Sequence, residues 1–91
     1  MLYLISYDIP DNKRRLRVAS LLLDSGERVQ ESVFECHLEP AQYKTVLMRL
    51  RRVLVDEEDS LRVYCLCAEC AKRIEVFGQG RRSTPPDLVI I

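Results

Sequence analysis

Asp8 is the residue whose type and position most clearly suggest chemistry, because it directly follows the apolar run 2–7. A carboxylate at the end of a buried strand costs free energy unless a partner compensates its charge. One such partner would be an arginine, since Arg14, Arg15 and Arg17 follow the intervening turn. The other would be Mg²⁺, which accepts one or two carboxylates and retains several waters. One carboxylate per chain can hold such an ion weakly, and a second copy of the chain across a twofold axis would supply a second Asp8.

Arginines occur at two further places where they could contact phosphate. Arg28 begins a strand-like segment, and Arg49 and Arg52 lie on the basic side of a helix-like segment. The guanidinium fork matches phosphate oxygens in geometry and charge, which favours nucleic-acid contacts. The alternative is that these side chains only keep exposed helix faces in water. The candidate nucleic-acid-binding residues are Arg14, Arg15, Arg17, Arg28, Arg49 and Arg52.

Cys65, Cys67 and Cys70 form a C-x-C-x-x-C cluster. Together with Cys36 or His37 they could complete a four-ligand zinc site. Strand spacing would put Cys65 and Cys67 on one sheet face, which is awkward for tetrahedral geometry, so we favour buried apolar thiols. His37 is more simply interpreted as an exposed strand residue than as a base or a metal ligand.

The elements that must position these residues follow from hydrophobic periodicity and turn signals. The predicted strands are 2–8, 28–30, 33–38 and 60–67, and the predicted helices are 12–24 and 40–55. We expect Leu16, Ala19, Leu22 and Leu23 to share the buried face of the first helix, with Val18 beside them, and Gly26 to end it in a left-handed conformation. This order predicts an α+β, ferredoxin-like (βαββαβ) antiparallel sheet with helices on one face.

The remaining segments are predicted to lie outside this core. The acidic run 56–59 is expected in solvent, 68–72 as a short turn or a single helical turn, and 73–77 and 87–91 as further strands. An apolar strand at 87–91 would be an exposed edge, so we expect residues 79–91 to form a tail that docks on another chain, and residues 1–78 to form the domain. A homodimer would also cover the second sheet face.

The composition limits the classes of function that the protein can have. Ninety-one residues allow one domain, and 14 basic against 14 acidic side chains exclude a general polycation. No signal peptide or membrane-spanning run is visible. We therefore expect a cytoplasmic protein with reduced cysteines.

Three segments, 2–15, 26–36 and 59–64, closely resemble the second core CRISPR-associated protein family, the small partner of the CRISPR integrase. Tyr7-Asp8-Ile9 and Arg28-Val29-Gln30-x-Ser32-Val33-Phe34 carry the likeness, which extends over residues 1–80. The C-x-C-x-x-C cluster is not part of the shared pattern.

The resemblance implies a ferredoxin-like homodimer in which Asp8 faces its twin across a cleft and is the magnesium ligand. It implies that Arg15, Arg17, Arg28 and Phe34 are linked to nuclease activity on RNA or double-stranded DNA. It also implies a role without that activity, in which the dimer bridges two integrase dimers on a new DNA spacer and the tail pairs with a neighbouring chain.

Three functions are therefore carried forward. The first is a magnesium-dependent endonuclease that serves CRISPR spacer acquisition, with Asp8 as the metal ligand and the arginines on the phosphate. The second is a non-catalytic DNA-bridging scaffold for the integrase, and the third is a small zinc- or ligand-binding ferredoxin-like module.

Overall fold

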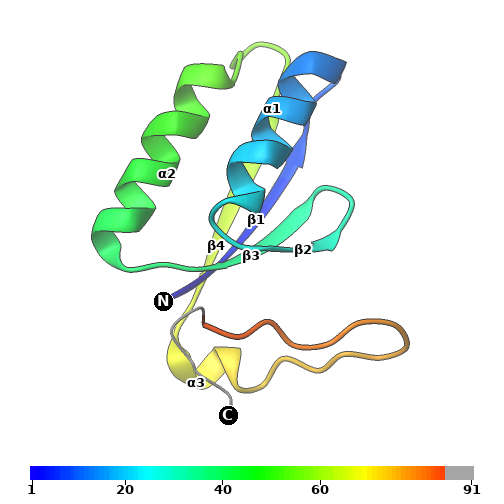
Figure 1. Cartoon of the computed structure of the whole chain (residues 1–91), viewed down its shortest axis with the longest axis vertical. Coiled ribbons are helices and arrows are strands. Elements are labelled where there is room, and N and C mark those ends of the chain that lie inside the picture. The colour runs from blue at the N-terminus through cyan, green and yellow to red at the C-terminus, as the bar shows by residue number, and fades with distance from the viewer. Residues whose placement is uncertain (86–91) are drawn as a thin grey trace.

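β1 (Leu2–Asp8) lies in the middle of a four-stranded antiparallel sheet (Figure 1). The computed structural model describes residues 1–85. The strand order is β2-β3-β1-β4, where β2 is Glu27–Gln30, β3 is Val33–His37 and β4 is Ser60–Leu66. The predicted split of segment 28–38 into two strands is confirmed, and the bounds of all four strands agree with the sequence to within one residue.

Two helices cover one face of this sheet, α1 (Asn12–Leu23) and α2 (Pro40–Val53) (Figure 1). A single helical turn, α3 (Ala68–Ala71), follows β4. The observed order β1-α1-β2-β3-α2-β4 is the predicted ferredoxin-like α+β arrangement. None of the helices in residues 1–85 is long and apolar enough to cross a membrane.

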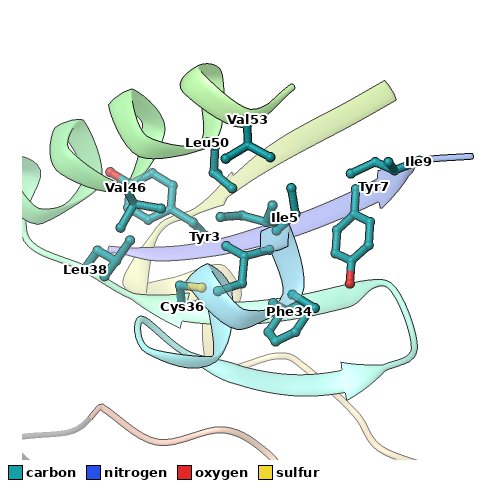
Figure 2. Packing of buried hydrophobic residues seen from close by; sticks show 13 residues of the cluster. Tyr3, Ile5, Tyr7, Ile9, Phe34, Cys36, Leu38, Val46, Leu50 and Val53 are labelled. Atoms are coloured by element: carbon teal, nitrogen blue, oxygen red, sulfur yellow. The ribbon is translucent and has the colours of Figure 1, made fainter. Parts of the chain in front are cut away.

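The core lies between the helices and the sheet face that they cover, as Figure 2 shows. Alternate residues of β1, namely Tyr3, Ile5 and Tyr7, point into it. Phe34 and Cys36 of β3 join them and are fully buried. Because Asp8 follows Tyr7 in the same alternation, its side chain leaves the strand on the opposite side.

The buried face of α1 differs from the predicted one. Val18, Ala19 and Leu22 are buried, whereas Leu16 is 62% exposed and Leu23 is also exposed. Apolar residues cover a wider part of the helix surface than the part that contacts the core. The helix packs against the core through the side centred between Val18 and Leu22. Leu16 is thereby left at the surface near the end of β1.

Gly26 does not adopt the predicted left-handed conformation, because positive φ angles within residues 1–85 occur only at Gly78 and Gly80. A Cβ atom at Gly26 would instead lie 2.5 Å from both Cys36 Sγ and the Glu35 carbonyl oxygen. The position requires glycine because β3 passes close to the chain there.

The acidic run 56–59 is not wholly in solvent, which corrects the prediction for Asp59. Its side chain is only 1% exposed, and it accepts a hydrogen bond from the Val55 backbone N–H at 2.9 Å. The guanidinium of Arg14 binds both of its carboxylate oxygens, at 2.9 and 3.0 Å. The residue therefore ties the α2–β4 connection to the start of α1.

The segment after α3 forms no strand over 73–77, so that prediction is wrong for the single chain. Alternation alone makes no strand without a neighbouring backbone to pair with, and Phe77 is 84% exposed. Residues 81–84 lie against β2 and β3: Arg81 pairs with Glu27 at 3.1 Å, and Ser83 donates to Glu35 at 2.6 Å. The strand predicted at 87–91 lies outside the described residues.

Candidate functional site

Asp8 ends β1 at the surface, opposite Ser60 of β4. Its neighbours Tyr7 and Ile9 are buried, so the backbone on both sides of the exposed carboxylate is held by the core. None of the ion pairs within residues 1–85 includes Asp8, and the alternative that it pairs with Arg15 is therefore not what the structure shows. The carboxylate is available for a cation.

Arg15 holds the loop that follows Asp8. Its guanidinium donates to the carbonyl oxygens of Ile9 at 2.9 Å and Pro10 at 3.3 Å, and also binds the Asn12 side chain. These bonds use the backbone acceptors of the β1–α1 turn. Arg15 is half-buried, so it positions the turn beside Asp8 and still faces the groove described below.

Arg28 and Phe34 act as a unit across the β2–β3 pair, where they are register partners. The Arg28 guanidinium carbon lies 5.1 Å from the centre of the Phe34 ring, which is a cation–π contact. Phe34 is fully buried and packs near Tyr7, with ring centres 6.2 Å apart. Phe34 therefore cannot touch a substrate in this chain, and its position suits it to orient Arg28.

A groove of about 720 Å³ brings Asp8, Arg15 and Arg28 together. It runs between the end of β1, the first turns of α1 and the β2–β3 hairpin. Its wall also contains the exposed apolar side chains of Leu16 and Val29. Glu31 also lines the groove, so two carboxylates and two guanidinium groups lie in one place, which matches a divalent cation beside a phosphate.

Glu31 is a groove residue that the sequence analysis missed. Glu31 lies in the β2–β3 turn together with Ser32. The Glu31 carbonyl oxygen accepts a hydrogen bond from the Tyr7 hydroxyl at 3.5 Å, and the Ser32 carbonyl oxygen accepts one from the Tyr7 N–H at 3.1 Å. The available signal was topological: a hairpin whose second strand pairs antiparallel to β1 must turn beside the end of β1.

Arg14 does not line this groove and is bound instead by acidic residues of the α2–β4 connection. Besides Asp59, it binds Glu58 at 3.4 Å. The hydrogen bond from Arg14 holds the pKa of the Asp59 carboxyl below its ordinary value, and the same bond raises the pKa of Arg14. A guanidinium committed in this way has little left to offer a phosphate.

Three other arginines gather elsewhere. Arg17 of α1 and Arg49 and Arg52 of α2 line a second groove, of about 400 Å³, between the two helices. Asp24 is the acidic residue of its lining. The tertiary fold thus brings Arg17 together with Arg49 and Arg52, which follow it by 32 and 35 residues, in one basic surface that we call the helix groove.

The cysteine predictions are corrected. Cys36 alone is buried, and burial raises the pKa of its thiol to about 11. Cys65, Cys67 and Cys70 are exposed, because β4 is an edge strand and α3 projects beyond the sheet. Residues 1–85 contain no group of three or more His, Cys, Asp or Glu side chains arranged to hold a metal ion. The favoured interpretation as buried apolar thiols is thus wrong for these three residues, and the alternative four-ligand zinc site is not assembled in this part of the chain.

His37 is half-buried on β3, and its Nε2 atom is hydrogen-bonded to Ser83 Oγ at 3.0 Å. Since Ser83 donates its own proton to Glu35, the histidine helps to hold residues 81–84 against the sheet. It lies at the end of β3 remote from the Asp8 groove and does not line that groove.

Comparison with known proteins gives the family. A family model described as CRISPR associated protein Cas2 matches residues 1–74. The chain is 50% identical over 93 residues to the CRISPR-associated endoribonuclease Cas2 1 of Chloroflexus aurantiacus, with 100% of both chains covered. It is 46% identical over 79 residues to the CRISPR-associated endonuclease Cas2 2 of Thermus thermophilus, which covers 87% of this chain and 83% of that one.

Solved structures with a similar fold support the same family. The crystal structure of Streptococcus pyogenes Cas2 at pH 6.5 superposes with a TM-score of 0.76 at 37% identity, covering 86% of this chain and 100% of that one. A hypothetical protein from Thermus thermophilus superposes with a TM-score of 0.80 at 42% identity, covering 91% and 96%. The sequence, the ferredoxin-like fold and these likenesses lead to one conclusion: the chain belongs to the CRISPR-associated Cas2 family.

Proposed function

We propose that this protein is a magnesium-dependent endonuclease of CRISPR spacer acquisition that cleaves phosphodiester bonds in RNA or double-stranded DNA. Two kinds of support exist for nuclease activity: relatives named endoribonuclease and endonuclease at 50% and 46% identity, and the composition of the groove at the end of β1. The two names differ in the substrate they imply, so both RNA and DNA belong in any test.

The observation that carries the proposal is the exposed Asp8 carboxylate, free of ion pairs within residues 1–85, in one groove with Arg15 and Arg28. Asp8 would hold Mg²⁺ together with waters, which suits an ion that is usually bound by one or two carboxylates. The ion would supply charge neutralisation and an activated water. Arg28, held over the Phe34 ring, would bind a phosphate oxygen and stabilise its developing charge.

A homodimer completes this proposal, because a single chain offers only Asp8 and Glu31 in the groove. A twofold axis beside the end of β1 would bring two Asp8 carboxylates together. Exposed apolar side chains favour such pairing. Leu16 and Val29 border the groove, Tyr64 is exposed on β4, and Phe77 is exposed in the segment after α3.

The test replaces Asp8 by asparagine, which preserves size and removes the charge. The matched control is Asp56→Asn, an exposed carboxylate in the α2–β4 connection that lies outside the groove. Both variants are assayed on RNA and on duplex DNA, with Mg²⁺ and with a chelator. Asp8→Asn should lower Mg²⁺-dependent cleavage by about 100-fold or more, corresponding to roughly 3 kcal/mol of lost transition-state stabilisation. Full activity in Asp8→Asn, with the same metal requirement, would exclude the proposed site.

A second candidate function is favoured by the helix groove. Here the homodimer is a non-catalytic scaffold that binds duplex DNA and holds it for the CRISPR integrase, its partner. Arg17, Arg49 and Arg52 can contact successive phosphates without any catalytic group nearby. This function needs no Asp8, so the Asp8→Asn protein should still bind duplex DNA.

Duplex binding is tested with the double variant Arg49→Gln/Arg52→Gln. The control is Arg51→Gln, an exposed arginine of the same helix that does not line the groove. Each lost phosphate contact should reduce the slope of log K against log salt by about 0.9. A double variant with the unchanged salt slope, or a wild-type protein that fails to bind the integrase, would count against the scaffold.

A further inference from the structure

Cys67 and Cys70 form a pair of thiols that neither the proposed nuclease activity nor the proposed DNA binding uses. Cys67 is the N-cap residue of α3, and its Sγ accepts a hydrogen bond from the Cys70 backbone N–H at 3.5 Å. Both side chains are exposed and free. The pair is therefore accessible to a reagent from solution, while the local turn holds the two residues on the same side of the chain.

The surroundings give the two sulfurs different reactivity. The Cys70 backbone N–H stabilises the Cys67 thiolate and lowers the pKa of Cys67. The neighbouring Cys67 side chain raises the pKa of Cys70. A thiol with a lowered pKa attacks a disulfide first, and its neighbour then resolves the product. Cys36 cannot compete, because it is fully buried.

We propose that Cys67 and Cys70 are a redox pair that a low-molecular-weight disulfide, such as oxidised glutathione, converts reversibly into an intramolecular disulfide. This inference goes beyond the proposed nuclease function and does not depend on it. Residues three apart on a helical turn have Cβ atoms about 5–6 Å apart. A disulfide needs about 3.5–4.5 Å. Closure therefore requires a small rotation within one exposed turn.

The thiol–disulfide exchange proceeds in two steps. The Cys67 thiolate attacks one sulfur of the oxidant, forms a mixed disulfide and releases one glutathione thiolate, which takes up the proton that Cys67 lost. Cys70 then loses its proton and attacks Cys67 Sγ, which forms the protein disulfide and releases the second glutathione. Two protein thiols are oxidised by two electrons, and one glutathione disulfide is reduced to two thiols.

The place of the pair gives the reaction a structural consequence. α3 joins β4 to the segment that lies against β2 and β3, and Arg82 of that segment donates to the Ala71 carbonyl oxygen at 2.8 Å. A disulfide between residues 67 and 70 fixes the turn to which Arg82 is bound. Oxidation should therefore slow amide exchange at Ala71 and its neighbours.

The experiment treats the full-length native protein with oxidised glutathione, traps remaining thiols with an alkylating reagent and digests with a protease that cleaves after glutamate. Glu69 lies between the two cysteines. An intramolecular bond between residues 67 and 70 therefore yields two peptides joined by a disulfide, and a reductant separates them. Of the four thiols, two should be lost on oxidation and recovered on reduction.

Three variants assign the bond. Cys65→Ser is the matched control, since Cys65 is exposed two residues earlier, and it should still lose two thiols. Cys70→Ser should stop at a glutathione adduct on Cys67, and Cys67→Ser should show neither product. Four unreacted thiols in the wild type, a bond that requires Cys65, or a bond that joins two chains on a non-reducing gel would each overturn the proposal. Circular dichroism of each variant shows that it is folded.

Discussion

The contact between Arg28 and Phe34 yields a prediction that tests how the groove is built. The guanidinium carbon lies 5.1 Å from the ring centre, inside the roughly 6 Å range of a cation–π contact. Arg28 is exposed and Phe34 is fully buried, so the pair belongs with solvent-exposed contacts worth about 0.5–1 kcal/mol. Replacing Phe34 by leucine keeps an apolar side chain in the core and removes the ring.

The measurement is a double-mutant cycle with Phe34→Leu and Arg28→Gln, read from urea unfolding at one fixed protein concentration. Phe34→Leu should itself cost about 1–2 kcal/mol, because it removes part of the volume whose complete loss in Phe→Ala costs about 3–5 kcal/mol. That cost cancels in the cycle. The remaining coupling between the two substitutions should be about 0.5–1 kcal/mol.

Cleavage gives an independent readout of the same contact. If the ring holds Arg28 in the groove, Phe34→Leu should lower the cleavage rate by about 2–5-fold, since each 1.36 kcal/mol is a factor of ten. The control cycle pairs Arg28→Gln with Leu50→Ala, a fully buried residue of α2, and should be additive. Additivity within about 0.3 kcal/mol for Arg28 and Phe34 as well would refute the reasoning.

Three further predictions concern the fold around the groove. Asp59→Asn should lower the free energy of unfolding at neutral pH. Because Arg14 lowers the pKa of Asp59, the stabilisation by this carboxylate is present above the unfolded pKa and is lost as the pH falls below about 4. The free energy of unfolding, measured against pH, should therefore fall less towards acid pH in the variant than in the wild type. Gly26→Ala should cost about 1–3 kcal/mol in urea unfolding, since its Cβ would meet the chain of β3 at 2.5 Å, and an unchanged midpoint would contradict the close approach. At pH 8 a thiol reagent should modify the exposed cysteines quickly and Cys36 slowly, because a pKa of about 11 leaves only about 0.1% of its thiol ionised, and equal rates at all four would show that Cys36 is accessible.

Local pattern determined the elements. The apolar run 2–7 places β1, and Pro40 marks the start of α2. For α1 the sequence offers Asp11 or Asn12 as the cap, and the structure uses Asp11. These signals act within a few residues, and a buried strand or a capped helix needs no knowledge of its neighbours to be recognised. The same pattern failed for 73–77, because whether alternating residues become a strand depends on a partner backbone.

The sequence also pointed to Asp8 as the carboxylate of interest, since its position after a buried strand is a local property. It did not decide between a free and a paired Asp8. That depended on which arginine reached which acid: Arg14 binds Asp59, 45 residues away, and Arg15 binds the backbone of the β1–α1 turn. Neighbouring arginines on one helix point in different directions, so helix rotation decides their roles.

The sequence by itself thus determined the order of the elements, the family and the residue types available for a phosphate or a cation. Only the tertiary structure decided the groupings: Arg28 over Phe34, Glu31 beside Asp8, the helix groove, and Cys67 and Cys70 left exposed at the sheet margin. The physical reason is that element formation follows short-range periodicity, whereas a site depends on strand register, helix rotation and the edges of the sheet, which are set by packing over the whole chain.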